Sequence, residues 1–78
     1  MDISIEYCVV WNYKPRALSL GDELNNQFGD NIVKLKPGDR GAFEVFVNGQ
    51  LIFSKLQTDR FPEHEEIISF IEGILNVT

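Results

Sequence analysis

Cysteine and histidine are nearly absent, because the 78-residue chain has only one of each, Cys8 and His64. One cysteine cannot form an intramolecular disulfide, which excludes the disulfide framework typical of small secreted domains. One cysteine and one histidine also fall short of the ligand set of a structural zinc site. We therefore expect a protein of the reducing cytoplasm, without a bound metal or a resident cofactor.

Long apolar runs and a surplus of basic residues are missing as well. No stretch approaches the ~20 apolar residues that cross a bilayer. Residues 1–10 lack the basic start and long apolar core of a signal peptide. Twelve acidic and seven basic residues give a formal net charge of −5, which disfavours nucleic acid or an anionic membrane as the partner.

Apolar residues are sufficient for one small core. They make up 44% of the chain, and aromatic residues make up 12%, as in ordinary globular proteins. A chain of this length buries only about 60% of its unfolded surface, which limits it to one sheet-and-helix core. We predict a single domain over residues 1–78.

The first half of the chain predicts a strand and a helix. Residues 3–7 alternate apolar and polar side chains and residues 8–10 are continuously apolar, as in a central strand. Pro15 favours the first turn of a helix, which should begin at about this residue. Its apolar face consists of Ala17, Leu20, Gly21, Leu24 and Phe28. Gly29 should end the helix in the left-handed conformation, and Gly21 either allows a close approach to the sheet or is simply tolerated.

The middle of the chain predicts three further strands. Residues 32–35 form a short strand that ends at Pro37-Gly38, and the preceding helix implies a parallel crossover from the first strand. Residues 42–47 and 50–54 flank Asn48-Gly49, the preferred pair for a type I′ turn. We therefore predict an antiparallel hairpin.

The two faces of this hairpin follow from its turn, which pairs Val47 with Gln50. One face then carries Val45, Val47 and Ile52, and the other carries Phe46, Leu51 and Phe53. Both faces are apolar. We expect one to carry the helices and the other to be covered by the chain itself or offered to a partner, such as a second copy.

The last part of the chain predicts a connector and a helix. Residues 55–60 are polar, and the helix starts after Phe61-Pro62 with acidic residues in its first turn. Its buried stripe consists of Ile67, Ile68, Ile71, Ile74 and Leu75. His64 lies in this acidic first turn, but neighbouring helical residues point in different directions, so we expect a solvated helix start and no metal site. Residues 76–78 are expected to fray.

Carboxylates also occur on two strands that should be neighbours. Glu6 and Glu44 are expected to approach Lys34 or Lys36 across the sheet. Their spacing supports no catalytic pair of carboxylates.

Several short motifs, in this order and at this spacing, resemble the selenoprotein W/T/H group, also called the Rdx family. They are Ile5-Glu6-Tyr7-Cys8, Tyr13-Lys14-Pro15-Arg16-Ala17, residues 41–45, Asn48-Gly49 and Arg60-Phe61-Pro62. The resemblance covers nearly the whole chain. It implies a two-layer, thioredoxin-like α/β fold of element order β-α-β-β-β-α, with a mixed sheet of strand order 2-1-3-4 and two helices on one face. It also implies a role in cell redox homeostasis.

The family's redox turn is Cys-x-x-Cys or Cys-x-x-selenocysteine, and this chain departs from it because Trp11 stands at the second redox position. A dithiol mechanism needs a second thiol to resolve a mixed disulfide. Cys8 remains as the only candidate catalytic residue, a monothiol nucleophile that reacts with glutathione as co-substrate or with protein thiols. The alternative is a buried structural cysteine in a redox-inactive protein-binding module, which uses the Cys8–Trp11 turn and the exposed sheet face.

Candidate contact residues for a substrate or partner surround this turn. They are Val9, Val10, Trp11, Tyr13, Lys14 and Arg16. Trp11 is either a stacking ring for a partner or a hydrophobic plug in the turn. Tyr13 either hydrogen-bonds into the turn or covers the sheet edge. Lys14 and Arg16 either hold a thiolate or the carboxylates of glutathione, or are simply solvated.

Overall fold

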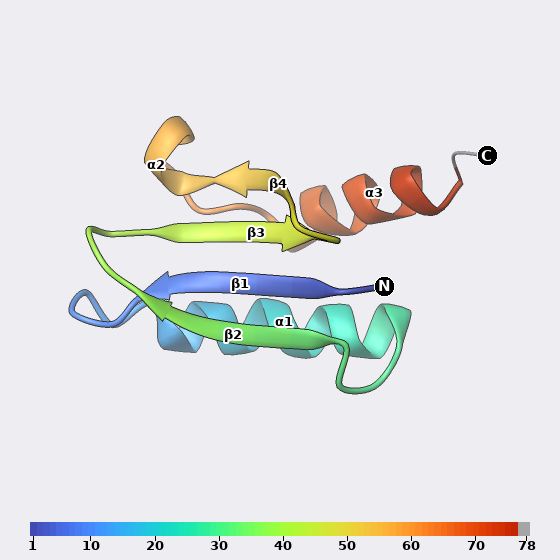
Figure 1. The fold of residues 1–78 in the computed structure, drawn as a ribbon, viewed down its shortest axis with the longest axis horizontal. Coiled ribbons are helices and arrows are strands. Elements are labelled where there is room, and N and C mark those ends of the chain that lie inside the picture. Colours follow the sequence, from blue (N-terminus) through green and yellow to red (C-terminus); the bar gives the residue numbers. More distant parts are fainter. Residues whose placement is uncertain (77–78) are drawn as a thin grey trace.

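The computed structural model describes residues 1–76, which form the two-layer α/β arrangement in Figure 1. The elements are β1 (Ile3–Cys8), α1 (Lys14–Phe28), β2 (Val33–Gly38), β3 (Phe43–Val47), β4 (Gln50–Ser54), α2 (Lys55–Thr58) and α3 (His64–Leu75). Within residues 1–76 no helix is long and apolar enough to cross a membrane. The expected fraying of residues 77 and 78 lies outside the described residues.

The four strands form one mixed sheet in the order β2-β1-β3-β4. β1 runs parallel to β2, as a crossover through α1 requires, and antiparallel to β3. This arrangement confirms the predicted strand order. β1 ends at Cys8, however, so Val9 and Val10 do not extend the strand and instead lie in an exposed turn.

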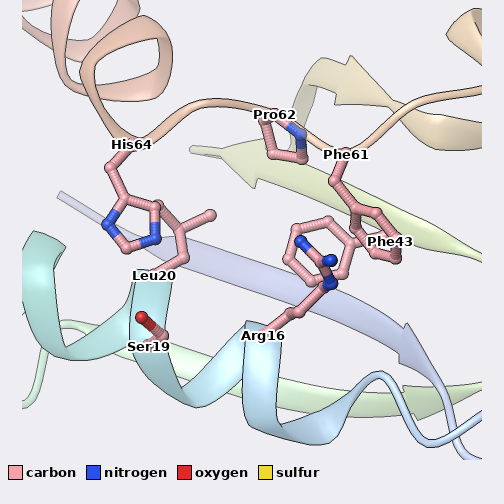
Figure 2. Close-up of a pocket in the computed structure, with 7 residues that line it drawn as sticks. All are labelled: Arg16, Ser19, Leu20, Phe43, Phe61, Pro62 and His64. Carbon is pink, nitrogen blue, oxygen red and sulfur yellow. The ribbon is translucent and has the colours of Figure 1, made fainter.

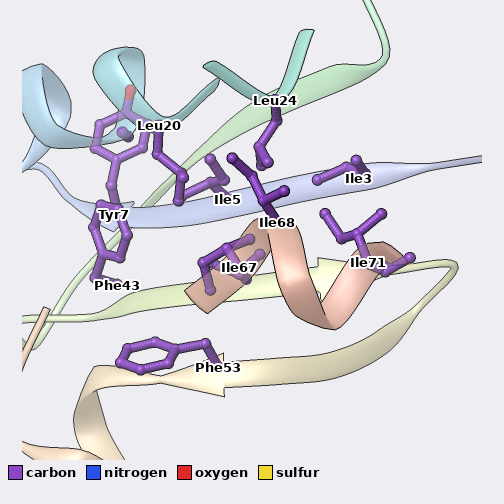
Figure 3. Close-up of a cluster of buried hydrophobic side chains, with 13 residues drawn as sticks. Ile3, Ile5, Tyr7, Leu20, Leu24, Phe43, Phe53, Ile67, Ile68 and Ile71 are labelled. Atoms are coloured by element: carbon purple, nitrogen blue, oxygen red, sulfur yellow. The ribbon is translucent and has the colours of Figure 1, made fainter. Parts of the chain in front are cut away.

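The core lies between the sheet and the two long helices (Figure 3). Ile3, Ile5 and Tyr7 of β1 face the helices, because side chains alternate along a strand. The helices contribute Ala17, Leu20 and Leu24 from α1 and Ile67, Ile68 and Ile71 from α3. Fully burying one such aliphatic side chain contributes about 1.5–3 kcal/mol. Both helices therefore cover one face of the sheet, as predicted.

The buried stripe of α3 is shorter than predicted. Ile74 and Leu75 have exposed fractions of 37% and 54%. In Figure 1 the end of α3 extends past the end of the sheet, so these side chains have no layer to pack against.

The hairpin turn is the predicted one, but the faces of β4 are not. Asn48 and Gly49 have φ angles of 52° and 81°, as a type I′ turn requires. A bulge then shifts the register, so that Val45 pairs with Phe53. Phe53 therefore joins the core with 5% exposure, and Ile52 is half-buried. The prediction that Phe53 lies on the face opposite Val45 is wrong.

The helix-free face of the sheet is consequently mixed and not apolar. Strand alternation and register place the buried polar residues Ser4, Glu44 and Ser54 there. Phe46 is half-buried on this face, and Leu51 is exposed. The expectation of a second apolar face fails because the bulge places Phe53 in the core and polar residues occupy much of the helix-free face.

The polar connector after β4 begins with an unpredicted helical turn, α2. The buried Glu44 carboxylate accepts hydrogen bonds from the Ser54 hydroxyl and from the backbone N–H of Lys55, the latter at 2.8 Å. The Ser54 hydroxyl in turn accepts the N–H of Gln57 at 3.1 Å. Glu44 thus caps α2. The expectation that Glu44 approaches Lys34 or Lys36 is wrong, because β1 lies between β3 and β2.

The end of α1 also differs in detail from the prediction. Gly29 ends the helix with φ 140° and ψ 148°, and the left-handed residue is Asn31, with φ 60°. A Cβ on Gly21 would lie 3.4 Å from Val33 Cγ1 on β2, which is an ordinary contact. Gly21 is therefore near the sheet but tolerated and not required.

Candidate functional site

Cys8 is the last residue of β1, and its side chain is fully buried. Its N–H donates to the Ala42 carbonyl at 2.8 Å, and its own carbonyl accepts the N–H of Tyr13 at 3.1 Å. Strand alternation directs it to the helix-free side, like Glu6 two residues before it. It accordingly does not belong to the described hydrophobic cluster between the sheet and the helices.

The four residues after Cys8 form a turn that projects from the end of the sheet. The N–H of Asn12 donates to the Val9 carbonyl at 3.0 Å, and Asn12 has a φ of 58°. Val9 also donates its N–H to the Gly38 carbonyl at 3.3 Å. Val9, Val10 and Trp11 are 55%, 82% and 59% exposed. The turn therefore presents three consecutive apolar side chains to solvent while the preceding cysteine is buried.

Trp11 rests on Gly41 in the loop between β2 and β3. A Cβ on Gly41 would lie 2.6 Å from Trp11 Cζ3, and Gly41 has a φ of 75°. Glycine is thus required there for both the ring and the backbone. With 59% of its surface exposed, Trp11 is not the hydrophobic plug of one interpretation.

Tyr13 begins a row of edge-to-face aromatic contacts that enters the core. Its ring centroid lies 6.1 Å from that of Trp11 and 4.7 Å from that of Phe61, which in turn lies 5.4 Å from Phe43. Within residues 1–76 the structure shows no hydrogen bond from the Tyr13 hydroxyl. Tyr13 therefore covers the end of the core instead of bonding into the turn.

Two cations lie against the Phe61 ring. The Arg16 guanidinium carbon is 4.0 Å from the ring centroid, and Lys55 Nζ is 5.2 Å from it. Lys55 also lies 5.4 Å from the Tyr13 ring. Lys14 is exposed, and in the described part of the chain neither it nor Arg16 pairs with an acidic side chain.

The sequence-derived candidates thus fall into groups. Cys8, Val9 and Trp11 gather at the end of β1 through backbone contacts with residues 38–42. Tyr13 and Arg16 gather around Phe61. Reasoning from the sequence missed Phe61 and Lys55 as part of this cluster, although the Arg60-Phe61-Pro62 motif was a usable signal.

A hollow of about 110 Å³ lies beside Arg16, between α1 and the start of α3 (Figure 2). It is lined by Arg16, Ser19, Leu20, Phe43, Phe61, Pro62 and His64. His64 Nδ1 lies 3.7 Å from Glu23 Oε1. Residues 1–76 contain no group of three or more side chains suited to hold a metal ion.

Arg60 and Glu66 form an exposed ion pair near the start of α3, with 2.7 Å between Arg60 Nη2 and Glu66 Oε2. The hydrogen bond from Arg60 lowers the pKa of Glu66, against a smaller opposing effect of burial. The same hydrogen bond raises the pKa of Arg60. Glu66 also accepts the N–H of Glu63 at 3.2 Å, so the pair lies beside the capping box of α3.

Two curated proteins are similar in sequence to most of this chain. Migration and invasion enhancer 1 from Bos taurus is 34% identical over 74 residues, which are 95% of this chain and 64% of that protein. Selenoprotein W from Ovis aries is 33% identical over 66 residues, covering 81% of this chain and 76% of that protein. The chain therefore spans less than two-thirds of the bovine relative.

A solved structure and a family model lead to the same grouping. The selenoprotein W-related protein from Vibrio cholerae superposes with a TM-score of 0.89 at 31% identity, covering 96% of both chains. The model of the Rdx family matches residues 2–73. This chain belongs to the Rdx family.

Proposed function

We propose that the protein acts in thiol redox homeostasis, with Cys8 as a monothiol nucleophile toward glutathione disulfide or protein disulfides. Membership of the Rdx family supports a thioredoxin-like, redox-related function in general terms. The observation that carries the finer proposal is the place of Cys8 at the end of β1, directly before an exposed turn and helix α1.

Reaction requires the buried Cys8 side chain to become accessible. The turn after it has one internal hydrogen bond, from Asn12 to Val9, and few contacts with the rest of the chain: the Val9 N–H on the Gly38 carbonyl and the Trp11 ring on Gly41 and beside Tyr13. Its side chains are largely exposed, so displacing the turn uncovers little apolar surface. Local openings of this kind cost less than global unfolding.

The proposed reaction is a thiol–disulfide exchange. The Cys8 thiolate attacks one sulfur of glutathione disulfide, a new sulfur–sulfur bond forms, the old one breaks, and a glutathione thiolate leaves and takes up a proton. α1 assists because its start has no side-chain cap and no acidic residue in its first turn, which favours an anion nearby. Trp11 carries no thiol, so the thiolate of a second glutathione must attack the mixed disulfide, which frees the Cys8 thiolate and forms glutathione disulfide.

Mass spectrometry of the folded protein with glutathione disulfide tests this proposal. We expect the mass to rise by one glutathione, the increase to be reversed by a reducing agent, and Cys8→Ser to show no increase. An unchanged mass of the folded wild-type protein, with prompt labelling after denaturation, would contradict a redox role.

A second candidate function is a redox-inactive module that binds a partner protein through the turn. It is favoured by the contrast between a fully buried Cys8 and the exposed Val10 and Trp11. This function predicts that Cys8→Ser keeps partner binding and that Trp11→Ala loses it. The redox function predicts that Cys8→Ser abolishes the covalent complex in non-reducing gels.

A further inference from the structure

The hollow between α1 and α3 is lined by an exposed arginine, Arg16, which lies against an aromatic ring and has no acidic partner within residues 1–76. The Arg16 guanidinium lies 4.0 Å from the Phe61 ring centroid. A guanidinium on an aromatic ring keeps the N–H groups at its edge free for hydrogen bonds. Within residues 1–76, Arg16 forms no ion pair, whereas Arg60 pairs with Glu66 and His64 lies near Glu23.

The lining of the hollow combines this cation with an apolar surface. Figure 2 shows Arg16 beside the rings of Phe43 and Phe61, with Ser19, Leu20 and His64 on the other side and Pro62 above. Ser19 supplies a hydroxyl, and no acidic residue lines the hollow. The nearest acidic side chain that the structure places beside a lining residue is Glu23, whose Oε1 lies 3.7 Å from His64 Nδ1 and not next to Arg16.

We propose that this hollow binds a carboxylate attached to a small branched apolar group. The carboxylate would form a bidentate pair with the Arg16 guanidinium, the geometry that arginine favours for such anions, and accept a hydrogen bond from Ser19. The apolar group would rest on Leu20, Phe61 and Pro62. A volume of about 110 Å³ suits an apolar group of this size.

Two sources supply this chemistry, a free short-chain acid and the C-terminal residue of a peptide. Cys8 lies on the opposite side of the sheet from the helices, so the site does not depend on its thiol. Binding at this site is therefore independent of the proposed redox function. Cys8→Ser should bind the same ligands as the wild type.

Titration followed by amide NMR shifts tests the site with three probes. Isovalerate represents the free acid, N-acetyl-leucine the peptide end, and N-acetyl-leucinamide is the matched neutral control. We expect saturable shifts at Arg16, Ser19 and His64 with one or both acids and none with the amide. Stronger binding of N-acetyl-leucine would identify a peptide end as the ligand, and stronger binding of isovalerate a free acid. Equal shifts with the amide, or no saturable shift with either acid, would overturn the proposal.

Substitutions distinguish a specific pair from a general attraction of anions. Arg16→Gln should weaken acid binding by about tenfold or more, because a charge-assisted bidentate pair is lost. Lys14→Gln removes an exposed cation of the same helical turn that does not line the hollow and should leave binding unchanged. Equal losses in the two variants would contradict the site. Amide chemical shifts in β2 and β3 that match those of the wild type will show that Arg16→Gln is folded.

Discussion

The two long helices begin in opposite ways, although each starts beside a proline. At α3, Glu63 and Glu66 form a capping box, and the first turn contains Glu65 and Glu66. At α1, Tyr13 provides no side-chain cap and the first turn contains no acidic residue. Acidic side chains stabilise a helix start and cations destabilise it. The start of α3 is therefore stabilised by its own side chains, and the start of α1 is not.

The incomplete helix start lies next to the exposed turn and the buried Cys8. The N–H of Tyr13 binds the Cys8 carbonyl, which joins the end of β1 to the start of α1. The start of α1, beside the residue for which we propose chemistry, is therefore less stabilised than the start of α3, for which we propose none.

The largest effect is expected from releasing the turn beside α1. Gly41→Ala introduces a side chain at φ 75° and 2.6 Å from Trp11 Cζ3, so it should destabilise the fold by about 1–2 kcal/mol and displace Trp11. Labelling of Cys8 by a thiol reagent should then become about tenfold faster, since local opening is easier. Gly49→Ala, also at positive φ but with open space around it, controls for strain alone. Equal labelling rates in the two variants would contradict the role of Trp11.

The second-largest effect is expected from removing the side-chain cap at the start of α3. Glu63→Ala removes the capping side chain and should lower the free energy of unfolding by about 1 kcal/mol, measured by urea denaturation. The labelling rate of Cys8 in the native state should not change. A faster rate would mean that the start of α3 and the turn beside α1 open together.

A smaller effect is expected from exchanging the electrostatics of the two helix starts. Lys14→Glu gives α1 an acidic first turn and should stabilise the protein by about 0.3–1 kcal/mol. It should also slow the reaction of Cys8 with anionic glutathione disulfide. The matched variant Glu65→Lys in α3 should destabilise the protein by a similar amount and leave that reaction unchanged. A faster reaction in Lys14→Glu would contradict the proposed part of α1.

The smallest effect is the pH dependence of the start of α3. The hydrogen bond from Arg60 holds the pKa of Glu66 below its usual value. A carboxyl group with a lowered folded-state pKa contributes stability above its unfolded pKa and loses it as pH falls through the folded pKa. Glu66→Gln should therefore flatten the acid side of the stability curve slightly, because the pair is exposed. Identical curves from urea denaturation at several acidic pH values would contradict this.

Local patterns predicted much of the fold, and tertiary packing decided the rest. Pro15 and Asn48-Gly49 marked the helix start and the hairpin turn, because both act through their own backbone geometry. The bulge in β4 and the turn α2 depend on burying Phe53 and Glu44, which strand periodicity does not show. These features arise from contacts between distant residues.

The candidate site was predictable in its position and less so in its environment. The sequence located Cys8 and Trp11 beside one another, and the structure places both at the end of β1. The hydrogen bond from the Cys8 N–H to Ala42 and the contact of Trp11 with Gly41 both involve the loop after β2. No local pattern reports such a contact, and the same holds for the cations around Phe61.

Whether Cys8 reacts in the native protein is tested most directly by its labelling rate at a series of low denaturant concentrations. If the turn opens locally, the rate should change little with denaturant until global unfolding begins, because little surface is exposed. A rate that rises from the first addition with the full denaturant dependence of unfolding would show that Cys8 is reached only in the unfolded chain. That result would contradict a redox role for Cys8 in the native protein.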